Sequence, residues 1–441
     1  MAGLTAARSL VRRGLSCVVL EASDGWGGVV RTHREAGFVF DAGPDSMLAQ
    51  KPEGVALCRE LGLGERLIST NPHQRTVYIL RGGRLHEMPD GMVLGVPTRL
   101  WPLAVSGLFS PSGKLRMALE PFVRARRDGA DESIASFLVR RLGREALDRL
   151  GEPLLGGIHA GDPARLSVRA TFPRLVEMEQ RHGSLLRGMR AAARGPAGSA
   201  FVSLAGGMGE LVGALSASIP AEALRLGAAA RLAREDDGFV VEAGAETWRT
   251  RAVVVAVPAH RASPLLAGIT PDAAATLGGI PFASTATVML GFRRIDVAHA
   301  LDGYGLVVPR SEGRRTLACS FVSTKLPGRA PDGHVLLRGF VGGVHAPEIL
   351  DRDDATLVQY VYEDLARVLG LRGSPVFSRV FRWPKGTPQM EIGHADRVAA
   401  VEKAIARVPG LYLTSGGFRG AGLPDVIADA QRVGSGLSFG V

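Results

Sequence analysis

The chain has 441 residues, 46% of them apolar, so it can bury a large core and is long enough for two or three domains. Its formal net charge is +10, but only five of its 53 basic residues are lysines. The excess therefore reflects either an arginine-favouring composition or a basic face for anionic lipid or a polycarboxylate substrate. Nucleic acid is disfavoured as a partner, because aromatic residues make up only 6% and the basic residues are scattered singly.

The cysteines and the apolar stretches indicate in which cellular compartment the protein works and whether it contacts a membrane. Cys17, Cys58 and Cys319 lie far apart without paired spacing, which favours free thiols in a reducing compartment, and we expect a cytoplasmic protein. No signal peptide is evident at the start of the chain. The most apolar stretch, residues 92–109, carries Arg99 and two prolines, so we expect a core or surface-dipping helix hairpin. Peripheral contact with the cytoplasmic face of a membrane stays open.

The first elements along the chain are typical of an α/β fold. Residues 4–13 have apolar side chains at helical spacing, Gly14 ends the predicted helix, and residues 17–21 form an apolar strand. A helix that leads directly into a strand is typical of a parallel sheet. Residues 253–257 and 411–413 are two further short apolar strands of the buried, parallel kind. We expect all three strands to share one sheet.

Two stretches of different composition separate these strands. Residues 92–200 are rich in Leu, Arg and Ala with helical periodicity, whereas residues 276–345 carry β-branched runs such as Ala286–Leu290. This pattern predicts one α/β domain that is interrupted by a helical insert and by a sheet-rich insert. The Gly-, Ala- and Arg-rich residues 191–200 are predicted to form a loop.

The N-terminal region shows part of a dinucleotide-binding motif. Gly3 matches the third glycine of G-x-G-x-x-G, and Glu21 closes the second strand, where the ribose-binding carboxylate belongs. Alone, Glu21 would equally be an ordinary strand-end acid. The glycine pair Gly27-Gly28 allows the backbone to pass close to a ligand. The segment resembles the LEAxxRxGGRxxT segment of two-domain flavoproteins, although Gly25 stands where those proteins have arginine.

The motif's first strand and first two glycines would precede Gly3, and they supply the amide donors for a pyrophosphate. We therefore expect that the start codon was placed too late and that the natural protein has about 10–15 more residues. The alternative is a truncated product that is not an enzyme, because a sheet without its central strand exposes two strand edges.

Further motifs follow one another in a characteristic order. They are PLLGGIHAGDP (153–163), TFPRL (171–175), GGM (206–208), FRWP (381–384) and GGFRGAGLPD (416–425). Each motif is weak alone, but the ordered series resembles the oxygen-dependent, FAD-containing protoporphyrinogen oxidase family of the flavin amine oxidase superfamily.

The resemblance implies an α/β architecture with three parts. It implies a discontinuous, Rossmann-like FAD-binding domain of the GR2-type, two-dinucleotide-binding-domain flavoproteins, a mixed-sheet substrate domain and a helical membrane-facing insert. The corresponding boundaries in this sequence are 1–70, 200–268 and 396–441 for the FAD-binding domain, 71–91 and 269–395 for the substrate domain, and 92–199 for the insert.

The resemblance also implies a reaction and its partners. A porphyrinogen substrate, protoporphyrinogen IX, would lose six electrons through FAD, two at a time, to molecular oxygen, which yields protoporphyrin IX and hydrogen peroxide in haem biosynthesis. Because the cofactor performs the hydride chemistry, little acid–base equipment and no metal are expected. Coproporphyrinogen III stays an alternative substrate, since the two porphyrinogens differ in peripheral carboxylates. An amine oxidase or a desaturase is a more distant alternative, and a homodimer is left open.

Site residues carry over position by position. The family's FAD contacts correspond to Gly3, Glu21, Ala22, Gly27, Gly28, Gly43, Pro44, Asp45, Ser46, Ala229, Gly416, Gly420, Ala421, Gly422, Leu423 and Asp425. Asp425 would open the last helix, whose N-terminal amides can stabilise charge on the reduced flavin, or it would simply be an N-cap. Gly157 falls where a backbone carbonyl faces the substrate's pyrrole N–H groups, which makes it the catalytic candidate. Its alternative is a tight-turn glycine.

Some positions depart from the family's pattern. His159 stands where relatives commonly have an aromatic residue, and a structural histidine is the simpler interpretation. The arginine that holds a propionate in the plant and animal enzymes has no counterpart at residues 91–93. Arg75, Arg99 and Arg165 are therefore the candidates for this contact.

Overall fold

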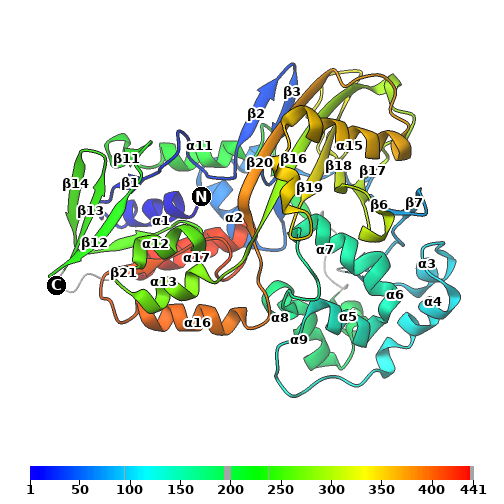
Figure 1. Cartoon of the computed structure of the whole chain (residues 1–441), viewed down its shortest axis with the longest axis horizontal. Coiled ribbons are helices and arrows are strands. Elements are labelled where there is room, and N and C mark those ends of the chain that lie inside the picture. Colours follow the sequence, from blue (N-terminus) through cyan, green and yellow to red (C-terminus); the bar gives the residue numbers. More distant parts are fainter. Residues whose placement is uncertain (94, 193–199, 237, 438–441) are drawn as a thin grey trace.

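The computed structural model describes residues 1–93, 95–192, 200–236 and 238–437. Figure 1 shows an elongated molecule with two parts. One part, which we call the first unit, contains both ends of the described chain and a layer of helices that includes α1 (Ala2–Val11) and α17 (Leu423–Gly436). The other part contains a large sheet and a group of shorter helices.

The parallel strands of the first unit form two separate pairs. β1 (Val19–Leu20) pairs with β11 (Leu224–Arg225), and β15 (Val253–Val255) pairs with β21 (Leu411–Leu413). The expectation that the three apolar strands share one sheet was therefore wrong. α1 packs against both β1 and β15, but the backbone hydrogen bonds of β1 run to β11 and those of β15 run to β21.

Helices cover these strands on both sides. α1 lies along α17, and α2 (Pro52–Glu60) also contacts α17 (Figure 1). α12 (Ala259–Leu266), α13 (Pro271–Gly278) and α16 (His394–Ile405) pack over β15 and β21 around a shared apolar core. This unit also contains α11 (Gly209–Ala217) and two antiparallel three-stranded sheets. One has the order β4 (Met47–Leu48), β10 (Phe201–Leu204) and β5 (Leu67–Ser69), and the other has the order β12 (Arg231–Glu235), β13 (Gly238–Ala243) and β14 (Glu246–Thr250).

The second part is built on a seven-stranded mixed sheet in the order β20-β16-β19-β18-β17-β6-β7. β17 and β6 pair in parallel, and all other neighbours are antiparallel. α15 (Asp354–Leu369) covers one face, where apolar side chains form a continuous core. The strands are β6 (Thr76–Arg81), β7 (Arg84–Glu87), β16 (Phe282–Arg293), β17 (Gly303–Val307), β18 (Thr316–Phe321), β19 (His334–Gly342) and β20 (Phe377–Pro388).

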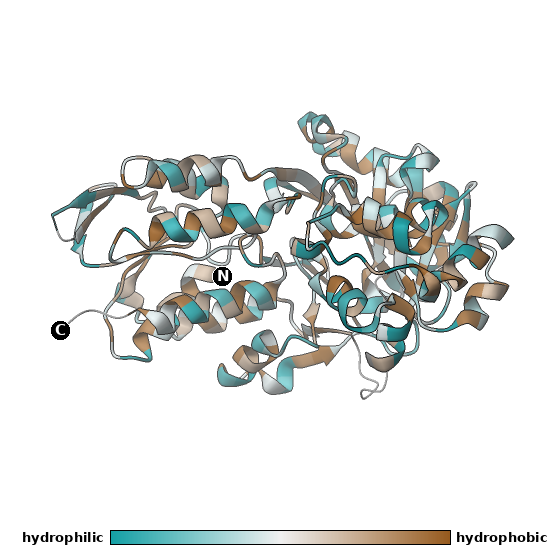
Figure 2. Ribbon diagram, turned by 90° about the horizontal axis from the view of Figure 1, so that it is seen from below, coloured by the Kyte–Doolittle hydropathy of each residue, from teal (hydrophilic) through white to brown (hydrophobic). Residues whose placement is uncertain are grey.

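Short helices pack against the opposite face of this sheet and form the helical insert. Figure 2 shows hydrophobic and hydrophilic residues side by side on many helices of the molecule, as amphipathic helices require. The helices are α3 (Leu100–Val105), α4 (Pro111–Ala118), the 3₁₀ helix η2 (Glu120–Phe122), α5 (Ile134–Leu142), α6 (Arg144–Ala146), the π-helical η3 (Leu147–Gly151), α7 (Glu152–His159), α8 (Val168–Thr171), α9 (Pro173–His182) and α10 (Leu185–Ala192).

Two expectations for this insert need revision. The stretch 92–109 begins with a small antiparallel pair, β8 (Met92–Val93) and β9 (Val96–Pro97), and only then becomes helical, so it is not a helix hairpin. Of the predicted loop at 191–200, residues 191–192 belong to α10, and residues 193–199 lie outside the described residues. None of the helices in the described ranges has the length and apolar character needed to cross a bilayer.

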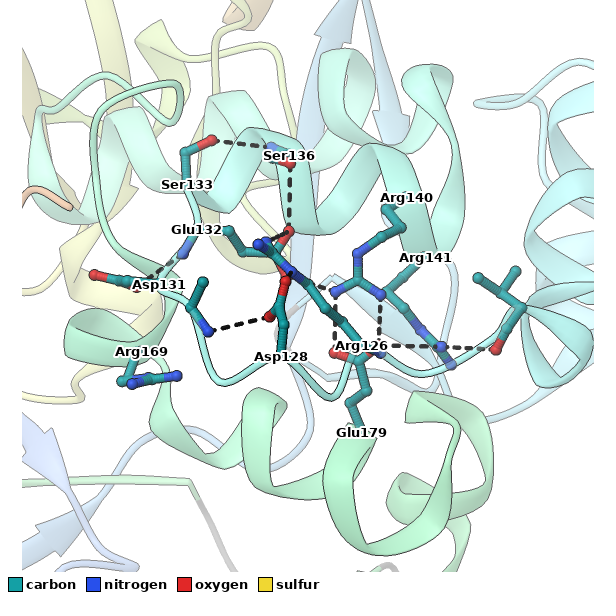
Figure 3. Close-up of polar contacts among 12 residues, drawn as sticks. Arg126, Asp128, Asp131, Glu132, Ser133, Ser136, Arg140, Arg141, Arg169 and Glu179 are labelled. Carbon is teal, nitrogen blue, oxygen red and sulfur yellow. Dashed lines mark hydrogen bonds and ion pairs between the residues drawn. The ribbon is translucent and has the colours of Figure 1, made fainter. Parts of the chain in front are cut away.

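A buried ion network holds the insert together (Figure 3). Arg141 is fully buried and pairs with Glu120 and, at 3.3 Å, with Glu179, while Arg140 bridges Glu179 and Glu132 at 2.5 Å each. Because every carboxylate in this network faces a guanidinium, the charges are compensated despite their burial. The network therefore fixes the relative positions of η2, α5 and α9.

Candidate active site

The carboxyl end of β1 presents the predicted ribose-binding acid. Glu21 Oε1 accepts hydrogen bonds from the backbone N–H of Ser23 at 2.9 Å and from its hydroxyl at 2.8 Å. Within the described residues, Oε2 has no hydrogen-bond partner, so it can accept from a ligand hydroxyl. Ala22 is exposed beside it, and the exposed Ala229 follows Ala228, whose N–H donates to the Glu21 carbonyl.

Two glycine-containing loops meet next to this strand end. Gly27 adopts a φ of +98°, and a β-carbon there would lie 2.7 Å from Val212 of α11, so glycine is required. A β-carbon on Gly43 would overlap the carbonyl oxygen of Val29. The exposed Gly28 lies between these contacts. The backbone of the 43–46 loop therefore packs directly on the loop that carries the glycine pair.

Asp45 is the charged centre of the 43–46 loop, in which it follows Pro44. Its Oδ1 accepts from the Ser46 hydroxyl at 2.7 Å and pairs with Lys325 Nζ at 2.8 Å, and Arg338 Nη1 lies 4.0 Å from Oδ2. Burial alone would raise the pKa of the Asp45 carboxyl, but Lys325 and Arg338 outweigh this effect and hold the pKa well below its ordinary value. Asp45 is therefore ionised.

The glycine-rich terminal segment forms the loop before α17. Gly422 is the N-cap of α17, and Asp425 is the third helical residue, so the N-cap interpretation of Asp425 was wrong. The Asp425 carboxylate pairs instead with the ammonium of Lys51 at the start of α2. The predicted residues Gly416, Gly420, Ala421 and Leu423 belong to the same loop or to the first position of the helix.

These elements fit a bound dinucleotide. α1, which includes Gly3, packs along α17, and α17 in turn contacts α2, which follows the 43–46 loop in sequence. The Glu21 acceptor, the glycine-lined loops and the helix N-terminus at Gly422 thus come from separate parts of the sequence and belong to one unit. Acceptors for ribose hydroxyls and helix-terminal amides for negative charge are the groups that such a cofactor needs.

Gly157 lies in α7 rather than in a tight turn, so the alternative interpretation of this residue was wrong. A β-carbon at Gly157 would lie 3.3 Å from Ala318 Cβ and 3.5 Å from Val307 Cγ1, so the helix backbone rests on the sheet. α7 ends at His159, and no described backbone N–H donates to the Gly157 carbonyl. This carbonyl is one of the free acceptors that every helix C-terminus leaves.

The other sequence candidates lie in different surroundings. Burial lowers the pKa of His159 to about 4, and its ring meets Phe172 edge-on at 5.7 Å, as expected for a neutral structural histidine. Arg99 pairs with Asp90 and Arg165 with Glu391, both on the surface, and Arg75 is exposed.

Three cations at the site were missed at the level of sequence: Lys51, Lys325 and Arg338. Arg338 carried a usable signal, because it interrupts the apolar run Leu336–Phe340 of a predicted strand. A charged residue at a strand position between apolar neighbours indicates a paired or functional group. The lysines carried no comparable signal.

Two open cavities in the described part of the chain differ from this junction in their linings. One of about 650 Å³ is lined by Val11, Trp26, the end of α11 and Leu224, and one of about 320 Å³ lies between β7 and α3. The first has no charged side chain in its lining. The charged groups Asp45, Lys325 and Arg338 therefore favour the junction of the glycine loops and the large sheet as the functional site.

The chain is similar to several known proteins. The family model described as flavin containing amine oxidoreductase matches residues 1–433. Coproporphyrinogen III oxidase of Bacillus subtilis is 34% identical, covering 94% of this chain and 89% of its own, and chloroplastic protoporphyrinogen oxidase of Nicotiana tabacum is 28% identical, covering 99% and 83%. A solved structure from Exiguobacterium sp. 255-15, described as a protoporphyrinogen oxidase, superposes with a TM-score of 0.87 at 33% identity, covering 98% of this chain and 95% of that one.

Proposed function

Because the chain belongs to the flavin containing amine oxidoreductase family, we propose that it is an FAD-dependent oxidase of a porphyrinogen, and that coproporphyrinogen III is its substrate. The cofactor is FAD. The relatives named above act on coproporphyrinogen III or protoporphyrinogen. Two further relatives, from Propionibacterium freudenreichii at 33% identity and from Staphylococcus aureus at 28%, are also coproporphyrinogen III oxidases, which supports that substrate over the protoporphyrinogen IX expected from sequence.

The observation that carries this proposal is the position of Gly157. Its unpaired carbonyl lies in the last turn of a helix that rests on the sheet. The sheet reaches the 43–46 loop through Arg338, beside Lys325 of the short helix that follows β18. A backbone carbonyl can accept hydrogen bonds from pyrrole N–H groups without exchanging protons itself. Gly157 would therefore orient the macrocycle while the helix excludes water from one face.

The cofactor would be held by the first unit. Glu21 would accept from ribose hydroxyls, the glycine loops at 27–28 and 43–46 would lie along it, and the amides that follow Gly422 would face its negative charge. When bound, FAD supplies the two-electron hydride chemistry. The protein's own task is to position the substrate and to exclude water, which agrees with the neutral His159.

Oxygen is the proposed electron acceptor. Complete oxidation of one porphyrinogen removes six electrons and six protons, so three O₂ would be reduced to three H₂O₂. The test mixes the FAD-loaded protein with coproporphyrinogen III without air and then admits air. We expect loss of the oxidised flavin spectrum, its return with air, and three peroxides per porphyrin formed. No spectral change with any porphyrinogen would overturn the proposal.

We also propose that the protein works in the cytoplasm on the membrane surface through the α3–α4 surface, which we define as Trp101, Val105, Leu115 and Phe122. These side chains are 61–81% exposed, and the exposed Arg124 follows them. Large exposed apolar groups beside cations suit an anionic bilayer interface.

Sedimentation with vesicles tests this surface. We expect binding to phosphatidylglycerol vesicles, weaker binding to phosphatidylcholine vesicles, and loss of binding in Trp101→Ser/Phe122→Ser. The control is Ile295→Ser, which removes another exposed apolar side chain away from these helices. Equal binding by both variants would refute the proposed surface.

A further inference from the structure

The 43–46 loop contacts two cations from the second part of the molecule, one on a short helix and one on the large sheet. Lys325, at the end of α14 (Val322–Lys325), lies 2.8 Å from Asp45 Oδ1 and 3.1 Å from the Ser46 hydroxyl. Arg338, on β19, lies 4.0 Å from the other Asp45 oxygen and donates to the Ala42 carbonyl at 3.3 Å. One carboxylate thus faces two cations.

The neighbouring charged groups do not compensate this excess of positive charge. Arg329 and Asp41 form a second buried pair, 3.3 Å apart, and Asp41 lies close enough to act on the pKa of Arg338. Among the described residues, the cluster therefore contains three cations and two carboxylates. Arg338 Nε is buried without a hydrogen-bond partner. Burial, the largest influence, lowers the pKa of Arg338, and Asp45 and Asp41 only partly oppose it. A buried cation without its own anion is costly.

The sheet register places this excess beside the predicted substrate face. Ala318, which Gly157 contacts, pairs with Phe340 across β18 and β19, and Ser320 pairs with Arg338 two residues further along. Side chains two residues apart point to the same face of a sheet. Arg338 therefore shares the face that α7 covers, and its guanidinium lies 4.7 Å from the Phe340 ring centre.

We propose that Arg338, with Lys325, is a binding subsite for a carboxylate of the substrate, namely a propionate that coproporphyrinogen III has and protoporphyrinogen IX lacks. This inference rests on the proposed function and extends it to substrate selection. Coproporphyrinogen III carries four propionates, whereas protoporphyrinogen IX carries two propionates and two vinyl groups.

Charge explains why such a subsite would discriminate between coproporphyrinogen III and protoporphyrinogen IX. A guanidinium matches a carboxylate with two parallel hydrogen bonds, and the incoming anion would balance the third cation of the cluster. A vinyl group in the same place offers neither charge nor hydrogen-bond acceptor. Binding protoporphyrinogen IX would then leave the third buried cation of the cluster without an anion of its own, which selects against this substrate.

The test measures equilibrium binding of the oxidised porphyrins, which do not turn over, by fluorescence titration of the FAD-loaded protein. We expect wild type to bind coproporphyrin III at least tenfold more tightly than protoporphyrin IX. Arg338→Met should lose this preference by weakening coproporphyrin III binding about tenfold, and Lys325→Met should weaken it in the same direction. Arg338→Lys should retain part of the preference. The control is Arg372→Met, which removes one exposed arginine after α15 and should change neither affinity.

Two results would overturn the inference. One is that Arg338→Met and Lys325→Met both keep the wild-type ratio of the affinities for coproporphyrin III and protoporphyrin IX. The other is loss of FAD from Arg338→Met with retention in Arg338→Lys, since the cation would then serve the cofactor. If Arg338→Met does not fold, Lys325→Met and Arg338→Lys decide the matter. Failure of the proposed function is a separate result, in which wild type binds neither porphyrin and oxidises neither porphyrinogen.

Discussion

Lys51 and Asp425 form an ion pair that joins the start of α2 to the first turn of α17, across 374 residues of sequence. The carboxylate also lies at the positive end of the α17 dipole. The pair therefore fixes the N-terminus of α17 against the element that follows the 43–46 loop.

Asp425→Asn should loosen this junction. The Lys51 side chain is 42% exposed, so the pair contributes at most about 1 kcal/mol to the free energy of unfolding, while FAD should dissociate several-fold more readily. A double-mutant cycle with Lys51→Met, read by urea unfolding and by flavin content, measures the coupling. Strictly additive effects of the two substitutions would show that the ion pair does not act as a unit.

Gly43→Ala should abolish stable flavin binding. The added methyl group would overlap the Val29 carbonyl, so one of the two loops must move. The flavin-to-protein absorbance ratio and the melting temperature report the change, and both should fall. The control is Gly213→Ala in α11, where a β-carbon meets nothing within 4 Å and the helix should gain about 0.5–1 kcal/mol. A fully flavinated Gly43→Ala protein would contradict the observed loop packing.

The adjacent glycines of α7 offer a matched pair. Gly157→Val would push α7 away from Ala318 and Val307 and displace the carbonyl, so kcat/KM for the porphyrinogen should drop at least tenfold. Gly156→Ala meets nothing within 4 Å and should retain activity. Steady-state porphyrin fluorescence measures both variants. Similar losses in the two variants would mean that helix flexibility, and not the position of Gly157, matters.

His159 should make stability depend on pH. Burial lowers its pKa from 6.5 to about 4, so between these pH values the unfolded chain binds a proton that the folded chain does not. The neutral His159 therefore contributes fully to the free energy of unfolding above pH 6.5, and this free energy falls by up to about 3 kcal/mol as the pH drops to 4. Urea unfolding of His159→Gln should show a flatter dependence over this window, whereas the exposed-residue control His73→Gln should match wild type. Parallel curves for His159→Gln and wild type would refute the assignment.

Local elements were predictable from sequence, but their assembly was not. The apolar runs at β1, β15 and β21 indicated strands, yet which strands pair depends on long-range contacts that no local pattern contains. The tight-turn alternative for Gly157 was wrong, because this glycine lies in a helix whose backbone packs on the sheet, and tertiary packing outweighs the low helix propensity of glycine.

The polar contacts of the site show the same division. The carboxylates Glu21, Asp45 and Asp425 were found through motifs, whereas their cationic partners were not. Lys325 lies 280 residues from Asp45 in sequence, and the excess charge at Arg338 exists only once the sheet meets the 43–46 loop. Site chemistry that depends on partners from distant segments needs the three-dimensional structure.

The most direct measurement is kcat/KM of the FAD-loaded protein for coproporphyrinogen III and for protoporphyrinogen IX under air, followed by porphyrin fluorescence. We expect flavin-dependent turnover and a value at least tenfold higher for coproporphyrinogen III. A higher value for protoporphyrinogen IX would contradict the proposed substrate, and flavin-loaded protein that oxidises neither compound would contradict the proposed function itself.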